Sequence, residues 1–349
     1  MLEHLDHGSN TFASHPIMKS CERLSVFKTI LPPCCVKYYP QDPTILFIST
    51  YKLEEGKKFG TIDIYKHKDE PQLVKSIDTS AILDLKIQGD RVATAHSDGK
   101  VVLWKFEVED LELTQINDFH MFEDTVTSVN FRDDKVVATC TDGSISILDL
   151  NDGTFGELPT RHDLECWISE FGELGEMSNV VFTGGDDSKM IAHDLRTQEM
   201  IWQTGPRFHD AGVVSILSAK PTWNSNNPNQ LWTGSYDDNL RIMDLRLMDP
   251  QNPSLMTGWL PKTLQQENLG GGVWRLIPSN TDNRVLACCM YDGARIVDIK
   301  DDKFEVTRYF KRDHESMCYG GDWKDNIVTT CSFYDNVVQV WDPESSIDM

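Results

Sequence analysis

Short apolar runs that alternate with tight turns recur along the chain and predict paired β-strands. In the clearest copy, the apolar run 231–233 leads to a turn at 236–239, and apolar residues then alternate from 240 to 245. A period of two is typical of a strand with one buried face, and Asp and Asn favour the intervening turn. The repeated unit is therefore a strand, a turn and a second strand.

The unit is found six times with an acidic turn. The turn aspartates are separated by 43 to 55 residues. They are Asp98, Asp142, Asp186, Asp237, Asp292 and Asp335. A degenerate copy at 60–66 has the strand but no turn aspartate. Seven copies at this period predict an all-β fold, a seven-bladed WD40-type β-propeller with four strands in each blade.

The two ends of the chain are expected to meet in one blade. Only three strand patterns follow residue 314, whereas the segment 24–30 near the start has strand character and no neighbour. We expect 24–30 to be the outer strand of the blade that holds Trp341, because closing the ring removes two exposed sheet edges. Residues 1–22 show no periodicity and are expected to form a disordered or surface-bound tail before a propeller at 23–349. The outer strand of the fifth blade is expected within 247–268.

Composition excludes several classes of protein. The chain has 349 residues and 40% apolar content, enough for a large core. No apolar run approaches the roughly 20 residues that span a membrane, and the N-terminus lacks a basic and then apolar leader. The nine cysteines form no CxxC pair. These features predict a cytoplasmic protein without a disulfide framework or zinc site.

The net charge of −22 argues against a nucleic-acid ligand, because phosphate binding needs Lys and Arg. It favours a basic partner or a cationic ligand. Solubility alone is the competing explanation.

Three histidines precede a turn aspartate by 21 to 28 residues, a separation that fits within one blade. His162 precedes Asp186, His209 precedes Asp237, and His314 precedes Asp335. A histidine at this position is expected to bond to the turn aspartate and fasten the blade, because buried polar groups need partners. Catalysis or ligand contact is the alternative for each.

Three aromatic residues occupy equivalent positions just before the inner strands, namely Trp167, Trp274 and Tyr319. Inner strands surround the channel of a propeller, so these side chains are expected to converge on one rim. Packing between blades is the alternative, because large aromatics dominate cores. Glycines 270–272 indicate close approach of the backbone beside Trp274.

Several strings of residues are much more specific than generic repeat signatures. They include 165–167, 181–188, 209–216, 233–239, 269–275 and 316–323. On these residues the chain resembles the WD-repeat diphthine methyl esterases of the diphthamide pathway, in a fungal form. The resemblance covers roughly 24–342 and is densest from 161 onward.

The resemblance implies a carboxylic ester hydrolase. Its substrate would be the methyl ester of methylated diphthine, a modified histidine on translation elongation factor 2, and its products diphthine and methanol. It also implies a cytoplasmic monomer that meets elongation factor 2 and other diphthamide-pathway proteins, with no cofactor, metal, membrane or nucleic acid. A non-catalytic scaffold that presents the elongation factor is the main alternative. A third and weaker alternative is a generic adaptor, such as a ubiquitin-ligase substrate receptor.

The implied substrate carries a trimethylammonium group, which aromatic faces hold by cation–π attraction. The expected binding residues are Trp167, Trp274, Tyr319, Glu165, Gly271, Gly272 and Arg275. The resemblance fixes no nucleophile, so we expect a water activated by a histidine, with backbone N–H groups of 270–272 facing the oxyanion. His314 is the first choice of base and His209 the second, with Ser316, Cys318 and Asp322 in the same group.

Overall fold

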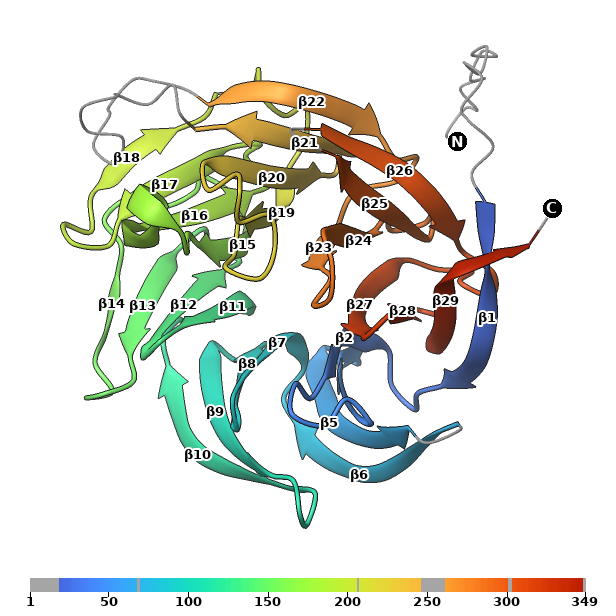
Figure 1. The fold of residues 1–349 in the computed structure, drawn as a ribbon. Coiled ribbons are helices and arrows are strands. Elements are labelled where there is room, and N and C mark those ends of the chain that lie inside the picture. The colour runs from blue at the N-terminus through green and yellow to red at the C-terminus, as the bar shows by residue number, and fades with distance from the viewer. Residues whose placement is uncertain (1–18, 68–69, 206, 246–260, 301–302, 348–349) are drawn as a thin grey trace, which may run out of the picture.

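The computed structural model describes residues 19–67, 70–205, 207–245, 261–300 and 303–347. These residues form seven four-stranded blades arranged radially around a central channel (Figure 1), which confirms the expected all-β propeller. Within the described ranges, the helical element is the short 3-10 turn η1 (Gly175–Asn179), and no helix there is long and apolar enough to cross a membrane.

Each blade runs from an inner strand at the channel to an outer strand at the rim. Blade 1 contains β2 (Pro33–Tyr38), β3 (Ile45–Thr50), β5 (Lys57–His67) and β6 (Pro71–Thr79), with β4 (Lys52–Glu54) paired to β5. Blade 2 contains β7 (Ile82–Gln88), β8 (Arg91–His96), β9 (Lys100–Glu107) and β10 (Glu112–His120). Blade 3 contains β11 (Val126–Arg132), β12 (Lys135–Cys140), β13 (Ile145–Asp149) and β14 (Phe155–Glu157).

The next blades follow the same order. Blade 4 contains β15 (Cys166–Phe171), β16 (Val180–Gly185), β17 (Met190–Asp194) and β18 (Met200–Gln203). Blade 5 contains β19 (Val213–Ser218), β20 (Gln230–Ser235), β21 (Asn239–Asp244) and β22 (Lys262–Asn268). Blade 6 contains β23 (Arg275–Pro278), β24 (Arg284–Cys288), β25 (Ala294–Lys300) and β26 (Lys303–Phe310). The outer strand β22 lies where the fifth blade was expected to have it.

Blade 7 joins the two ends of the chain. It contains β27 (Cys318–Lys324), β28 (Ile327–Ser332), β29 (Val337–Ile347) and the N-terminal β1 (Lys19–Lys28). β1 pairs antiparallel with β29, from Glu22 opposite Asp342 to Lys28 opposite Val337, so the expected closure is confirmed. Two parallel residue pairs with β26 also link β1 to blade 6.

β1 begins five residues before the expected segment 24–30 and ends two residues before its end. The buried Cys21 accounts for the earlier start, because it belongs to the core cluster that contains Phe310 and Trp341. Residues 1–18 of the expected tail lie outside the described residues, whereas 19–22 belong to β1.

Six of the seven inner strands have a register shift after their first residue, and β23 has none. It falls between Ile82 and Asp84 in β7, between Cys166 and Ile168 in β15, and between Cys318 and Gly320 in β27. Alternate residues beyond the shift face the channel, as the period of two requires. The shift therefore separates a ring of side chains at one mouth from the rings that line the channel itself.

Candidate functional site

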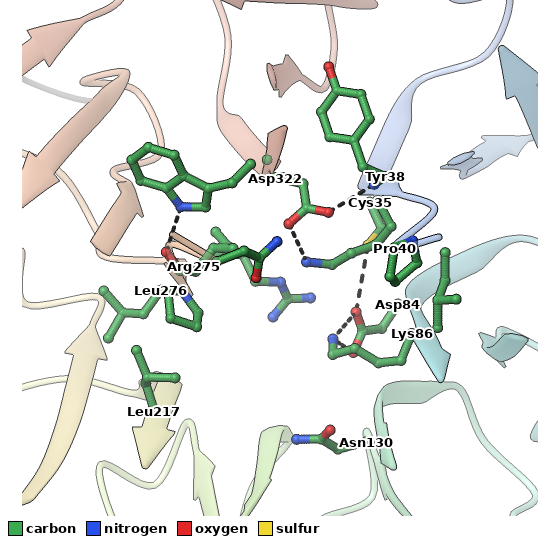
Figure 2. Close-up of a pocket in the computed structure, with 18 of the residues that line it drawn as sticks. Cys35, Tyr38, Pro40, Asp84, Lys86, Asn130, Leu217, Arg275, Leu276 and Asp322 are labelled. Atoms are coloured by element: carbon green, nitrogen blue, oxygen red, sulfur yellow. Dashed lines mark hydrogen bonds and ion pairs between the residues drawn. The ribbon is translucent and has the colours of Figure 1, made fainter. Parts of the chain in front are cut away.

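A cavity of about 540 Å³ lies in the central channel (Figure 2). The inner strands of all seven blades line it, together with the segments that follow β2 and β23. Five cationic and four acidic side chains belong to its lining, so the cavity is much less acidic than the chain as a whole.

Three of the lysines in this lining are neutralised by acids. Lys37 lies 3.2 Å from Asp322, Lys86 lies 2.8 Å from Asp84, and Lys220 lies 2.8 Å from Glu170. Burial opposes ionisation of Asp84, but the charges of Lys86 and Arg275 hold its pKa below the ordinary value. Asp84 is therefore a carboxylate at neutral pH.

Arg275, the first residue of β23, forms the floor of the cavity. Its side chain is only 8% exposed, and Figure 2 shows the guanidinium directed into the cavity. Among the described residues, Nη1 is buried without a hydrogen-bond partner. An unsatisfied buried donor costs about 1–3 kcal/mol. Such a donor indicates that a bound acceptor completes the site.

Cys35 and Asp84 also line the cavity, and both act electrostatically on Arg275. The Cys35 thiol is 3.8 Å from Asp84 Oδ1, a weak hydrogen bond. Burial and the Asp84 charge raise the pKa of Cys35, which keeps the thiol protonated. Neither residue was expected from the sequence. The pattern that could have indicated this site is a charged residue at alternate positions of an apolar inner strand, such as Asp84 and Lys86.

The three expected aromatic residues meet at one mouth of the channel. The Trp274 ring centroid lies 5.6 Å from that of Trp167, 5.8 Å from that of Tyr236 and 4.6 Å from that of Tyr319. We call these four residues the aromatic mouth. Trp274 is only 3% exposed, whereas the other three are half-buried. A ligand there would touch Trp167, Tyr236 and Tyr319, with Trp274 behind them.

Two acidic residues, Glu165 and Asp186, form an acidic pair beside the aromatic mouth. Trp167 Nε1 donates a hydrogen bond of 2.7 Å to Asp186 Oδ1. Burial, with a further contribution from the Glu165 charge, raises the pKa of Asp186 despite this bond. A cation at the mouth would relieve the repulsion between the two carboxylates.

Arg275 connects the aromatic mouth to the cavity. Its guanidinium carbon lies 5.1 Å from the Trp274 ring centroid. Burial raises the pKa of Tyr319, and the nearby Arg275 charge opposes that rise. On the cavity side, burial opposes the charge of Arg275, whereas Asp84 and then Cys35 raise its pKa. One guanidinium is thus shared by both parts of the channel.

The other expected catalytic residues lie in the framework of the blades. His314 is fully buried, and its Nε2 is 2.8 Å from Thr330 Oγ1, which also accepts a hydrogen bond from Trp341 Nε1. Burial lowers the pKa of His314 to about 4. His209 has the same arrangement, with its Nε2 2.9 Å from Thr233 Oγ1. Neither histidine lines the cavity.

Ser316 is also part of the framework, because its Oγ accepts the backbone N–H of Tyr334 at 3.1 Å. Cys318 is fully buried. Asp322 follows Tyr319 by three residues in β27, which is about 10 Å along a strand. It accepts the Tyr38 N–H in the cavity lining, at 2.8 Å. The expected grouping of Asp322 with Tyr319 and His314 is therefore wrong.

The expected pairing of histidines with turn aspartates needs a correction. His162 Nδ1 lies 2.9 Å from Asp187 Oδ1, not from Asp186. Burial opposes protonation, but Cys166 and the bond to Asp187 raise the pKa of His162 to about 10. Asp237 instead binds Arg241, and burial together with the Arg241 charge lowers the pKa of His209 to about 3. Asp187 is thus the turn residue of blade 4, which leaves Asp186 for the mouth.

The expected glycines are held by close packing. A Cβ atom added to Gly271 would lie 2.3 Å from the Cys289 carbonyl oxygen, and one added to Gly272 would lie 2.7 Å from Met290 Sδ. The N–H of Gly270 already donates to Asn268 Oδ1 at 2.9 Å, so it is not a free oxyanion donor.

The fold and the channel define a WD-type propeller with a polar cavity and an aromatic mouth. A chain in the crystal structure of the mitotic checkpoint complex has the same fold, with a TM-score of 0.70 over 99% of both chains at 13% identity. No protein-family model matches the chain. Diphthine methyltransferase of Saccharomyces cerevisiae is 36% identical over 91% of this chain and 97% of its own length.

Diphthine methyltransferase of Schizosaccharomyces pombe is 31% identical over 89% of this chain and 94% of its own length. The chain therefore belongs to the diphthine methyltransferase family.

Proposed function

We propose that this protein is an enzyme of diphthamide biosynthesis that hydrolyses the methyl ester of methylated diphthine on translation elongation factor 2. Membership of the diphthine methyltransferase family supports the pathway. The net charge of −22 suits a basic docking region on the elongation factor.

The chemistry of this substrate restricts where it can bind. The ester carbonyl is attached to the carbon that carries the trimethylammonium group, so adjacent protein groups must bind the cation and the ester. The observation that carries the proposal is the contact of Arg275 with Trp274, at 5.1 Å. It places an unpaired guanidinium Nη1 beside an aromatic cluster and an acidic pair.

In this arrangement the quaternary ammonium rests on the half-buried rings of Trp167, Tyr236 and Tyr319. A quaternary ammonium has no N–H to donate, and aromatic faces attract it by about 0.5–2 kcal/mol. Glu165 and Asp186 add negative charge beside Trp167.

Arg275 then faces the ester. Its Nη1 donates to the carbonyl oxygen and stabilises the negative charge that develops there when the carbonyl is attacked. The polar cavity below Arg275 supplies the attacking water. Asp84 accepts the proton of that water, because it is ionised and lines the same cavity as Arg275. The tetrahedral intermediate expels methoxide, which takes a proton and leaves as methanol. The carboxylate of diphthine remains.

Transfer of the methyl group to an acceptor other than water is the second candidate, because the relatives are named methyltransferases. The experiment incubates the purified chain with elongation factor 2 that carries methylated diphthine, and no other protein is added. Hydrolysis releases one methanol per elongation factor and lowers its mass by one methylene group. Demethylation without methanol would favour methyl transfer. No reaction, with stable binding of the factor, would favour a scaffold.

A further inference from the structure

Arg275 is a buried cation of the channel, and among the described residues its Nη1 has no hydrogen-bond acceptor. Three of the lysines in the cavity lining, Lys37, Lys86 and Lys220, are each paired with a carboxylate at 3.2 Å or less. Only 8% of the surface of Arg275 is exposed. A buried charge without a close partner is costly, so a ligand that brings an anion to Arg275 would be favoured.

The geometry of a guanidinium specifies which anion fits best. It presents parallel N–H groups in a planar fork that matches both oxygens of a carboxylate. An ester has no negative charge and offers a weaker acceptor. Arg275 should therefore bind a free carboxylate more strongly than its methyl ester.

The aromatic mouth favours a cation, whereas Arg275 favours an anion. The half-buried rings of Trp167 and Tyr319 lie within 5.6 Å of Trp274, centroid to centroid, and Asp186 is bonded to Trp167. These groups attract a cation that cannot donate hydrogen bonds. The guanidinium carbon lies 5.1 Å from the same Trp274 ring. A ligand that contacts both groups must therefore carry an anion and a cation close together.

We propose that Arg275 and the aromatic mouth form a binding site for a betaine-type zwitterion, which is a carboxylate and a quaternary ammonium on the same carbon. The identity of the natural ligand rests on the function proposed above, where the product is such a zwitterion and the substrate is only a cation. The site consequently holds the demethylated product more tightly than the methyl ester. Release of diphthine is then slower than release of unreacted substrate.

Small probes test the site without the elongation factor. The full chain is titrated with glycine betaine, glycine betaine methyl ester, choline and acetate, and binding is followed by calorimetry and by tryptophan fluorescence. We expect glycine betaine to bind at least about tenfold more tightly than its methyl ester, the effect of one charged hydrogen bond. Choline should bind like the ester, and acetate more weakly than glycine betaine.

Two substitutions of Arg275 test whether this residue causes the preference for glycine betaine over its methyl ester. Arg275→Met should reduce the ratio between glycine betaine and its ester to about one, and Arg275→Lys should retain part of it, because Lys keeps the charge but lacks the fork. Tyr334→Ala is the matched control, since Tyr334 is 69% exposed and its ring contacts Phe333, not Trp274. Melting curves establish that each variant is folded.

Equal affinity of the wild-type chain for glycine betaine and its ester would overturn the inference, even if Arg275→Met fails to fold. Acetate binding as tight as that of glycine betaine would overturn it too, since the site would then select any carboxylate. The binding result can be judged independently of the proposed hydrolysis. Methanol release without betaine preference rejects only the zwitterion site, and betaine preference without methanol release rejects only the hydrolysis.

Discussion

The guanidinium carbon of Arg275 lies 5.1 Å from the centroid of the Trp274 ring, and this contact joins the two halves of the channel. On one side are Trp167, Tyr236 and Tyr319, and on the other a cavity of about 540 Å³. Both residues are adjacent in the chain, at the start of β23. A single dipeptide therefore brings an aromatic wall and an unpaired cation to the same point.

Replacing Arg275 by Met should reduce methanol release by about a hundredfold, the usual effect of removing one donor to an oxyanion. Stability should change little, because the guanidinium makes no hydrogen bond through Nη1 to any residue that the structure describes. Single-turnover methanol release and thermal melting measure the two effects. Wild-type rates in folded Arg275→Met would exclude Arg275 as the oxyanion partner.

Removing one exposed ring of the aromatic mouth should weaken substrate binding. Trp167→Ala or Tyr319→Ala should raise KM by roughly tenfold, as expected when about 0.5–2 kcal/mol of cation–π attraction is lost. The effect on kcat should be smaller. Steady-state kinetics on the methylated elongation factor measure both constants, with Tyr334→Ala as the control. If KM is unchanged in both folded variants, the ammonium binds elsewhere.

The acid sensitivity of the fold should come from its buried histidines. Burial lowers the pKa of His314 to about 4, against 6.5 in the unfolded chain. The unfolded state therefore binds the proton first, and this contribution to stability is complete above pH 6.5 and falls as the pH drops toward 4. Urea unfolding should show a loss of about 2 kcal/mol per such histidine at pH 5 relative to pH 7.

His314→Asn should make that pH dependence shallower, because it removes one of the titrating groups. Its methanol release at pH 7 should follow the folded fraction. A well-folded His314→Asn protein that releases no methanol would instead restore His314 as the base.

The N-terminal strand should be required for a stable ring. Deleting residues 1–28 removes the whole of β1 and exposes an edge of β29. We expect the free energy of unfolding to fall by at least about 3 kcal/mol, from the lost ladder hydrogen bonds and the loss of Cys21 from the core. A synthetic peptide of residues 19–30, added in trans, should raise the melting temperature again. A truncated chain that melts like the full chain would show that the closure contributes nothing to stability.

The sequence predicted the fold because its signal is local. A turn aspartate followed by alternating apolar residues specifies each hairpin, and the period specifies the number of blades. The closing strand was also predictable, although the burial of Cys21 that sets its start depends on distant partners. The convergence of Trp167, Trp274 and Tyr319 followed from their equivalent positions in the blades.

The rest of the site depends on details that no local pattern encodes. Two adjacent acids at 186 and 187 are equivalent in sequence terms, and only the structure assigns Asp187 to His162 and Asp186 to Trp167. Asp322 is near Tyr319 in sequence, yet the strand carries it into the cavity. Among the described residues Arg275 Nη1 has no acceptor because the nearby acids pair with lysines, and no local pattern in the sequence encodes that choice.

The fate of the oxygen atom of water tests the central claim most directly. The purified chain is allowed to demethylate the methylated elongation factor in oxygen-18-labelled water, and both products are examined by mass spectrometry. Hydrolysis at the carbonyl next to Arg275 predicts one labelled oxygen in the diphthine carboxylate and unlabelled methanol. Label in the methanol, or demethylation that forms no methanol, would contradict the account, because the methyl carbon and not the carbonyl carbon would then be the site of attack.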